Sequence, residues 1–156
     1  MVIQRWQSVM LLITAILMAC FTFLSIGQMQ TPVQSLDFTT LGFDIEGSST
    51  GGAPSGMEQY TWGFFIVSLL SFIIPLLDIF LYKNLRYQRM LCLVEIVFIL
   101  GVITIGAVYG YYIFAPYHVS WSSMIIAPFI SLVSTYLAWK LIGRDMRTLR
   151  NSERFI

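Results

Sequence analysis

The sequence predicts an all-α integral membrane protein, a single domain of residues 1–156 with four transmembrane helices in one bundle. Hydrophobic residues make up 57% of the chain and charged residues only 11%, whereas a soluble domain carries roughly 25% charged residues. A helix needs about 20 apolar residues, at about 1.5 Å each, to cross ~30 Å of hydrocarbon. Four stretches meet this length, so we expect spans at about residues 8–26, 62–82, 90–114 and 122–141.

The distribution of basic residues predicts that both termini are cytoplasmic. The formal net charge is only +1, yet every lysine and arginine lies at the N-terminus, in the second connection or at the C-terminal end of the chain. The first connection, residues 28–61, and the third, around "APYHVSW", contain none. Four crossings place all the basic residues on one side, and the positive-inside rule makes that side cytoplasmic.

The sequence lacks the residues that several classes of functional site need. Cys20 and Cys92 are the only cysteines and form no CxxC motif, and His118 is the only histidine. A zinc site, a redox motif or a pair of haem ligands would need more cysteine or histidine residues. We find no Asp-rich pair, no Ser/His combination within the membrane and no phosphate-binding glycine loop. We therefore expect neither an enzyme nor a bound cofactor.

The first span could instead be a cleaved signal. "LMAC", which ends at Cys20, loosely resembles a lipoprotein cleavage box. The apolar run continues beyond it as "FTFLSI", whereas the apolar core of a signal is short and a polar stretch follows the cut. We therefore expect a retained span.

The first connection is acidic and has two parts. Its first part contains enough apolar residues to form a short hairpin or to lie on the bilayer surface: Leu36, Phe38, Leu41, Phe43 and Ile45. The segment "GSSTGGAPSG" follows and is typical of a flexible linker. The connection could therefore be a docking surface for a partner, or more simply a solvated tether.

Small and hydroxyl side chains predict which helix faces pack together, because helices gain no hydrophobic reward for association within a membrane. Each span has such a stripe at helical spacing. The clearest is the GxxxG arrangement of Gly106 and Gly110, which allows another helix to approach closely. One packed face on each helix indicates one compact bundle.

Two carboxylates, Asp78 and Glu95, lie within the apolar spans, in the stretch "DIFLYKNLRYQRMLCLVEI". Helical spacing places Glu95 on the face of Gly106, and Asp78 continues the serine stripe of its own span, so both are expected to point inward. They could form a proton or cation site. The simpler alternative is a structural cluster in which long basic side chains pair with the two acids. The candidate cations are Arg5, Lys83, Arg86, Arg89 and Lys140.

The C-terminal tail, residues 143–156, is predicted to form a short basic helix that continues the fourth span. Four arginines share one side of it, and such a helix commonly lies against anionic lipid headgroups. They are Arg144, Arg147, Arg150 and Arg154. We therefore expect contact with the cytoplasmic leaflet, and no binding of nucleic acid.

Three stretches of the chain match a known sequence pattern: "VIQRWQ" at the start, "DIFLYKNLRYQRMLC" with Leu81–Asn84 at its centre, and "GRDMRTLRNSERFI" at the end. Together they resemble domain-of-unknown-function family 4293, uncharacterised four-span inner-membrane proteins of Gram-negative bacteria. Met146 and Ile156 depart from the acid and the base that we expect in the family. The resemblance implies four spans and a location in the bacterial inner membrane, and it implies no reaction.

These observations favour a non-enzymatic accessory or scaffold subunit of a larger membrane complex, with another membrane protein as its partner. The alternative is a small solute, ion or proton-coupled transporter that uses Asp78 and Glu95.

Overall fold

The four predicted helices are confirmed, and each is long and apolar enough to cross a membrane. The computed structural model describes residues 2–30, 35–45, 61–81, 84–112 and 118–153, without the side chains of residues 2–5, 44–45 and 152–153. The helices are α1 (Val2–Phe23), α2 (Trp62–Phe80), α3 (Leu85–Tyr112) and α4 (Ala127–Glu153), and a 3₁₀ turn, η1 (Ser123–Ile126), precedes α4.

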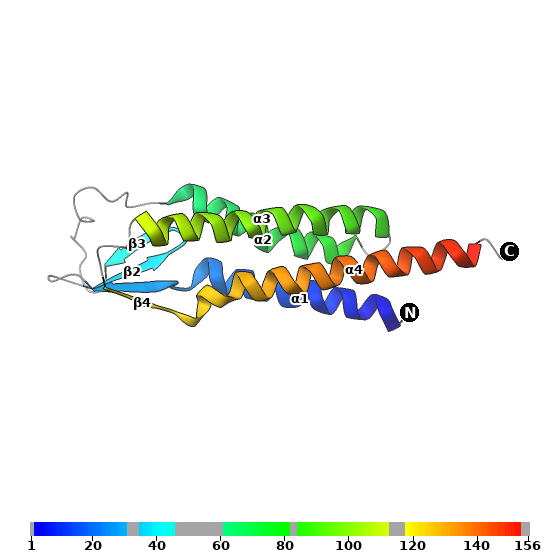
Figure 1. Cartoon of the computed structure of the whole chain (residues 1–156), viewed down its shortest axis with the longest axis horizontal. Coiled ribbons are helices and arrows are strands. Elements are labelled where there is room, and N and C mark those ends of the chain that lie inside the picture. The colour runs from blue at the N-terminus through cyan, green and yellow to red at the C-terminus, as the bar shows by residue number, and fades with distance from the viewer. Residues whose placement is uncertain (1, 31–34, 46–60, 82–83, 113–117, 154–156) are drawn as a thin grey trace.

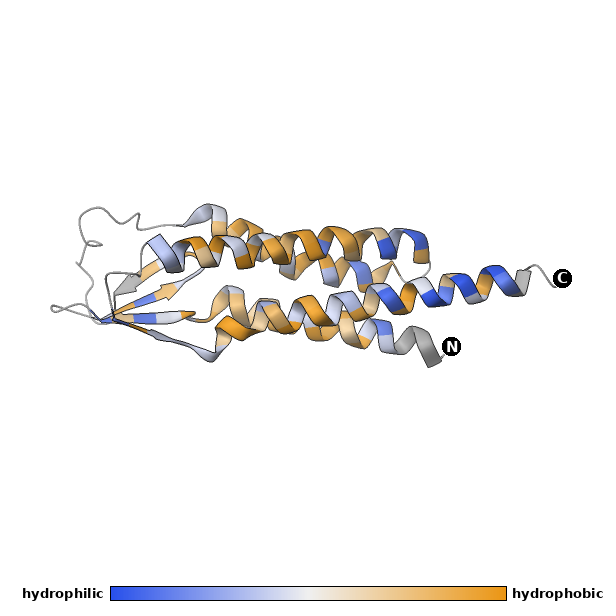
Figure 2. Cartoon of the chain, in the orientation of Figure 1, coloured by the Kyte–Doolittle hydropathy of each residue, from blue (hydrophilic) through white to orange (hydrophobic). Residues whose placement is uncertain are grey.

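The helices form an antiparallel bundle in which each contacts two neighbours (Figure 1). Helix α1 packs against α2 and α4, and α3 packs against the same two helices. Both chain ends lie at one end of the bundle, which we call the terminal end. Figure 2 shows apolar residues along the middle of the bundle, and hydrophilic residues where α3 begins and where α4 ends.

Helix α4 extends beyond the rest of the bundle at the terminal end (Figure 1). Its 27 residues correspond to about 40 Å, more than the ~30 Å of hydrocarbon in a bilayer. The described part of the predicted tail, residues 143–153, continues α4 without a break. Arg144, Arg147 and Arg150 therefore belong to the same helix as the fourth span.

The prediction of an all-α protein was wrong in one respect, because a four-stranded antiparallel sheet lies at the other end of the bundle, the sheet end. Its strands are β1 (Gly27–Gln30), β2 (Ser35–Thr39), β3 (Gly42–Ile45) and β4 (His118–Trp121), in the order β3-β2-β1-β4. The β2–β3 hairpin is one of the two alternatives expected for this segment. Strands β1 and β4, of four residues each, were not predicted.

The sheet covers the end of the bundle with an apolar face. Met29, Leu36 and Phe38 are buried there, and the ring of Phe38 stacks on Phe64 of α2 with centroids 6.3 Å apart. The hydroxyl of Thr40 donates a hydrogen bond to the carbonyl oxygen of Thr22 at the end of α1, at 2.7 Å. Sheet and helices therefore share one core.

Buried side-chain hydrogen bonds join every neighbouring pair of helices into a closed ring. Thr22 of α1 bonds Ser68 of α2 with 2.7 Å between the hydroxyl oxygens. Cys92 joins α3 to α2, and Thr135 joins α4 to both α3 and α1. Because these bonds lie among apolar side chains away from water, they hold the helices together where hydrophobic burial cannot.

We expect Thr22→Val to lower the free energy of unfolding by about 1 kcal/mol, since it removes the α1–α2 bond while keeping the side-chain volume. Thermal unfolding in a mild detergent measures the loss. Thr104→Val is the matched control, because Thr104 is exposed and bonds only the Leu100 carbonyl of its own helix. Equal losses for the two variants would contradict a role for the interhelical bond.

Candidate functional site

Asp78 is fully buried near the end of α2, one turn before the connection to α3. The thiol of Cys92 in α3 donates a hydrogen bond to Asp78 Oδ2, with 3.0 Å between the sulfur and the oxygen. The other carboxyl oxygen, Oδ1, is buried without a hydrogen-bond partner. The described partner of Asp78 is therefore a neutral donor.

Glu95 of α3 has the same kind of environment. It is fully buried, and its Oε1 accepts a hydrogen bond from the Thr135 hydroxyl of α4 at 3.0 Å. Its Oε2 is buried without a partner. The Thr135 oxygen also lies 3.3 Å from the Thr14 hydroxyl oxygen of α1. A hydroxyl has one proton to donate, so while Thr135 donates to Glu95 it can only accept from Thr14.

The two carboxyl groups belong to one polar cluster inside the bundle. Cys92, which bonds Asp78, lies three residues before Glu95, so the thiol and the second carboxyl group share a face of α3. Gln88 is one turn further toward the terminal end and is also buried, with no partner for its side-chain oxygen. We call Asp78, Cys92, Glu95 and Thr135 the carboxyl cluster.

The structure shows no described cation against either acid. Arg86 and Lys140 are exposed, and the guanidinium of Arg89 lies over the ring of Trp139, 4.7 Å from its centroid. Among the described side chains, hydrogen bonds to Asp78 and Glu95 come from the neutral groups of Cys92 and Thr135. Lys83 and the side chain of Arg5 lie outside the described residues, so pairing with them stays a prediction.

Sequence reasoning missed a third buried acid, Asp145 of α4. It is 9% exposed and accepts a hydrogen bond from the side-chain nitrogen of Gln7 in α1. Its position between Arg144 and Arg147 in the sequence gives no sign of burial. Only the packing of α1 against α4 turns it inward.

Within the described residues, no group of three or more His, Cys, Asp and Glu side chains is arranged to hold a metal ion. The chemistry that the carboxyl cluster itself offers is hydrogen bonding and the uptake and release of protons, since a carboxyl group is a donor when protonated and only an acceptor when ionised.

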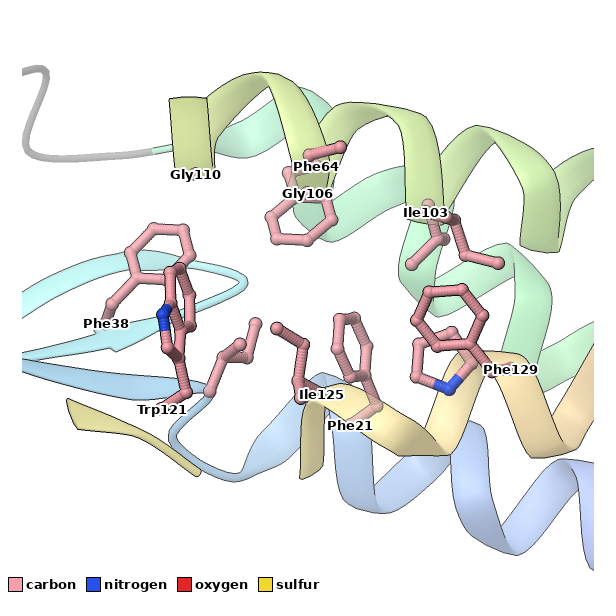
Figure 3. A pocket seen from close by; sticks show the side chains of 13 residues that line it. Phe21, Phe38, Phe64, Ile103, Gly106, Gly110, Trp121, Ile125 and Phe129 are labelled. Carbon is pink, nitrogen blue, oxygen red and sulfur yellow. The ribbon is translucent and has the colours of Figure 1, made fainter. Parts of the chain in front are cut away.

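A separate apolar pocket of about 230 Å³ lies at the sheet end, bordered by all four helices and the sheet (Figure 3). Gly106 and Gly110 of α3 form one wall, and Ile125 and Phe129 lie opposite them. The other lining residues are also apolar: Phe21, Ile26, Phe38, Phe64, Val102, Ile103, Ala107, Trp121 and Pro128. A pocket with such walls suits hydrocarbon better than a polar ligand.

The predicted GxxxG residues face aromatic rings in this pocket. A Cβ atom at Gly106 would lie 3.8 Å from Phe64 Cζ, and one at Gly110 would lie 3.7 Å from Trp121 Cη2. Both are ordinary van der Waals distances. The nearest neighbours are therefore side-chain rings and not the backbone of another helix.

The predicted headgroup contacts lie along the projecting part of α4. Arg144, Arg147 and Arg150 are exposed and recur every three residues, so they lie near one another on the helix surface. Arg154 is outside the described residues. Contact of these side chains with lipid stays a prediction.

The comparison with known proteins agrees with the resemblance seen in the sequence. The family described as Domain of unknown function (DUF4293) matches residues 3–155, nearly the whole chain. No curated protein matches the sequence. Functional inference therefore depends on the geometry of the chain itself.

We expect Gly106→Ala to change the free energy of unfolding by less than about 1 kcal/mol, because the added methyl group meets only Phe64 at contact distance and alanine favours a helix. Gly42→Ala is the contrasting control, since Gly42 has a φ of 141°, which strains any residue with a Cβ. Thermal unfolding of both variants measures the difference. A large loss for Gly106→Ala alone would show that this position needs glycine for close packing.

Proposed function

The chain belongs to the DUF4293 family, and from its own geometry we propose that it is a small proton-coupled membrane carrier. Asp78 and Glu95 are the proposed proton-binding groups. In this proposal the protein lies in the bacterial inner membrane with both termini in the cytoplasm, so that the carboxyl cluster is in the cytoplasmic half of the bilayer.

One observation supports the proposal above all others: two fully buried carboxyl groups on neighbouring helices each accept a single hydrogen bond from a neutral donor. An ionised group in an apolar interior without a cation costs far more energy than a neutral one. Such a site therefore favours a proton on the carboxyl group, and ionisable residues inside spans commonly mark proton or ion pathways.

Buried polar side chains lie on both sides of the carboxyl cluster along the bundle. Gln88 and the Gln7–Asp145 pair lie between the cluster and the terminal end. Toward the sheet end, Ser71 and the Thr22–Ser68 pair continue the polar interior. In the proposed carrier, protons enter the cluster from the terminal end, and the aromatic core beneath the sheet closes the other end.

The variants Asp78→Asn and Glu95→Gln distinguish a proton-binding role of the two acids from a structural role in ion pairs. Each amide keeps an acceptor oxygen for Cys92 or Thr135, so we expect the free energy of unfolding to change by less than about 1 kcal/mol. If Asp78 or Glu95 were one half of a buried ion pair, its loss would cost about 3–5 kcal/mol. Thermal unfolding in detergent gives this comparison.

Infrared difference spectra between neutral and alkaline buffer test the proton directly, because solvated carboxyl groups are already ionised in both buffers. We expect the C=O band of a protonated carboxylic acid to weaken in each single variant and to disappear in the double variant. Glu58→Gln, in the polar first connection, is the control and should leave the band unchanged. A band that survives in the double variant would refute the proposed proton site.

Transport is tested with the protein in sealed vesicles that contain a pH-sensitive dye. Wild-type protein should dissipate an imposed pH gradient in the presence of its solute, and the double variant should not. Because the solute is not known, pools of metabolites, fractionated by charge and size, serve as the probe. Equal proton movement by wild type and double variant with every pool would contradict the carrier.

A specific feature of α4 also favours the accessory-subunit alternative. The helix extends beyond the bundle and presents Arg144, Arg147 and Arg150 as an exposed basic surface, which could dock an acidic partner. Crosslinking in native membranes, followed by purification in mild detergent, tests it. A stoichiometric partner that is lost with the three arginines supports the alternative, and a partner-free protein contradicts it.

The proposed orientation predicts opposite labelling of the two ends. Ser120→Cys on β4 and Asn151→Cys on α4 are both at exposed positions, and each is introduced into a Cys20→Ser, Cys92→Ser background. A membrane-impermeant thiol reagent applied to intact spheroplasts should label residue 120 and not residue 151. The reverse pattern, or equal labelling, would overturn the orientation.

A further inference from the structure

A groove of about 390 Å³ lies between α3 and α4 at the terminal end, and we call it the basic groove. Arg89 of α3 forms one side and α4 forms the other. The α4 residues are Trp139, Lys140, Leu141, Gly143, Arg144 and Arg147. Four of the seven lining residues are therefore basic, and none is acidic.

Arg89 is held in place within this groove. Its guanidinium carbon lies 4.7 Å from the centroid of the Trp139 ring, a cation–π contact. On α4, the position of a Cβ at Gly143 would be 3.5 Å from the same carbon, so the absence of a side chain at Gly143 leaves space for the guanidinium. A guanidinium that lies over a ring keeps its N–H groups free to bind a ligand in the plane of the guanidinium.

No acidic side chain lines the groove to balance its positive charge. Asp145, the acid next to Arg144 in the sequence, accepts its hydrogen bond from Gln7 of α1 and does not line the groove. Like charges that lie close together repel one another. A bound anion removes this repulsion, and arginine forks match the oxygen atoms of a phosphate group.

The surroundings of the groove indicate a lipid phosphate. Leu93 is one turn from Arg89 along α3 toward the middle of the bundle, and Tyr136 is one turn from Lys140 along α4 in the same direction. These side chains are 48% and 51% exposed. A phosphate in the groove would therefore lie directly below apolar helix surface that faces hydrocarbon, where acyl chains can pack.

We propose that the basic groove binds the phosphate of an anionic phospholipid from the leaflet at the terminal end. Arg89 and Lys140 contact the phosphate from the two helices, and Arg144 and Arg147 attract the headgroup. The acyl chains lie along the exposed faces of α3 and α4. This site is independent of the proposed proton-coupled function, and it needs only that the helices span a bilayer.

Native mass spectrometry of the full chain in mild detergent tests the site, with phosphatidylglycerol and phosphatidylcholine as probes. Wild type should retain phosphatidylglycerol in preference to phosphatidylcholine. Arg89→Lys keeps the positive charge but loses the paired N–H groups of the guanidinium and its contact with the Trp139 ring. We expect the affinity for phosphatidylglycerol to fall about tenfold, which is the effect of losing one charge-assisted hydrogen bond. Lys140→Gln, at an exposed position, should lower it by a similar factor.

Arg150→Ala is the control, because Arg150 is exposed on α4 but does not line the groove. It should leave phosphatidylglycerol binding within twofold of wild type. Equal binding by wild type, Arg89→Lys and Lys140→Gln would mean diffuse attraction to a basic helix and would overturn the proposal. A second experiment adds inorganic phosphate as a competitor. If phosphate displaces the lipid at equal concentration, the groove binds free phosphate and the proposal of a lipid ligand is overturned. Circular dichroism and elution volume verify that each variant is folded.

Discussion

The structure depends on one constraint: helices inside hydrocarbon gain no hydrophobic free energy by associating, so packing and polar contacts must hold them together. This chain meets the constraint with a closed ring of buried hydrogen bonds, in which each helix is joined to both of its neighbours. The hydroxyl groups of Thr22 and Thr135 are central to this ring, because each satisfies its own polar atoms within the protein. Loss of one bond weakens two helices at once.

The same constraint makes Asp78 and Glu95 different from the other members of the ring. A threonine or serine needs one or two partners, whereas each carboxyl group leaves one oxygen buried without any. A carboxyl group, unlike a hydroxyl group, can also take up and release a proton at this position. The two buried ionisable groups are the physical basis for the proposed role in proton binding.

The contact between α3 and α4 is the most varied surface of the bundle. Its middle is closed by the Glu95–Thr135 bond, its sheet end opens into the apolar pocket, and its terminal end forms the basic groove. One helix contact therefore combines an apolar pocket, a buried polar bond and a basic groove along its length. The α3–α4 contact is thus where the proposed proton site and the proposed lipid site meet.

The sequence by itself determined the number of spans and the gathering of basic residues at one end, because hydropathy and charge order depend only on position along the chain. It also indicated that Asp78 and Glu95 face inward. Only the tertiary structure decided their described partners: a thiol and a hydroxyl on neighbouring helices, 14 and 40 residues away in sequence. The sheet likewise joins β1 to β4, which α2 and α3 separate in the sequence, a pairing of two short strands that no local pattern encodes. Distances between helices are set by packing, and packing is a property of the folded chain.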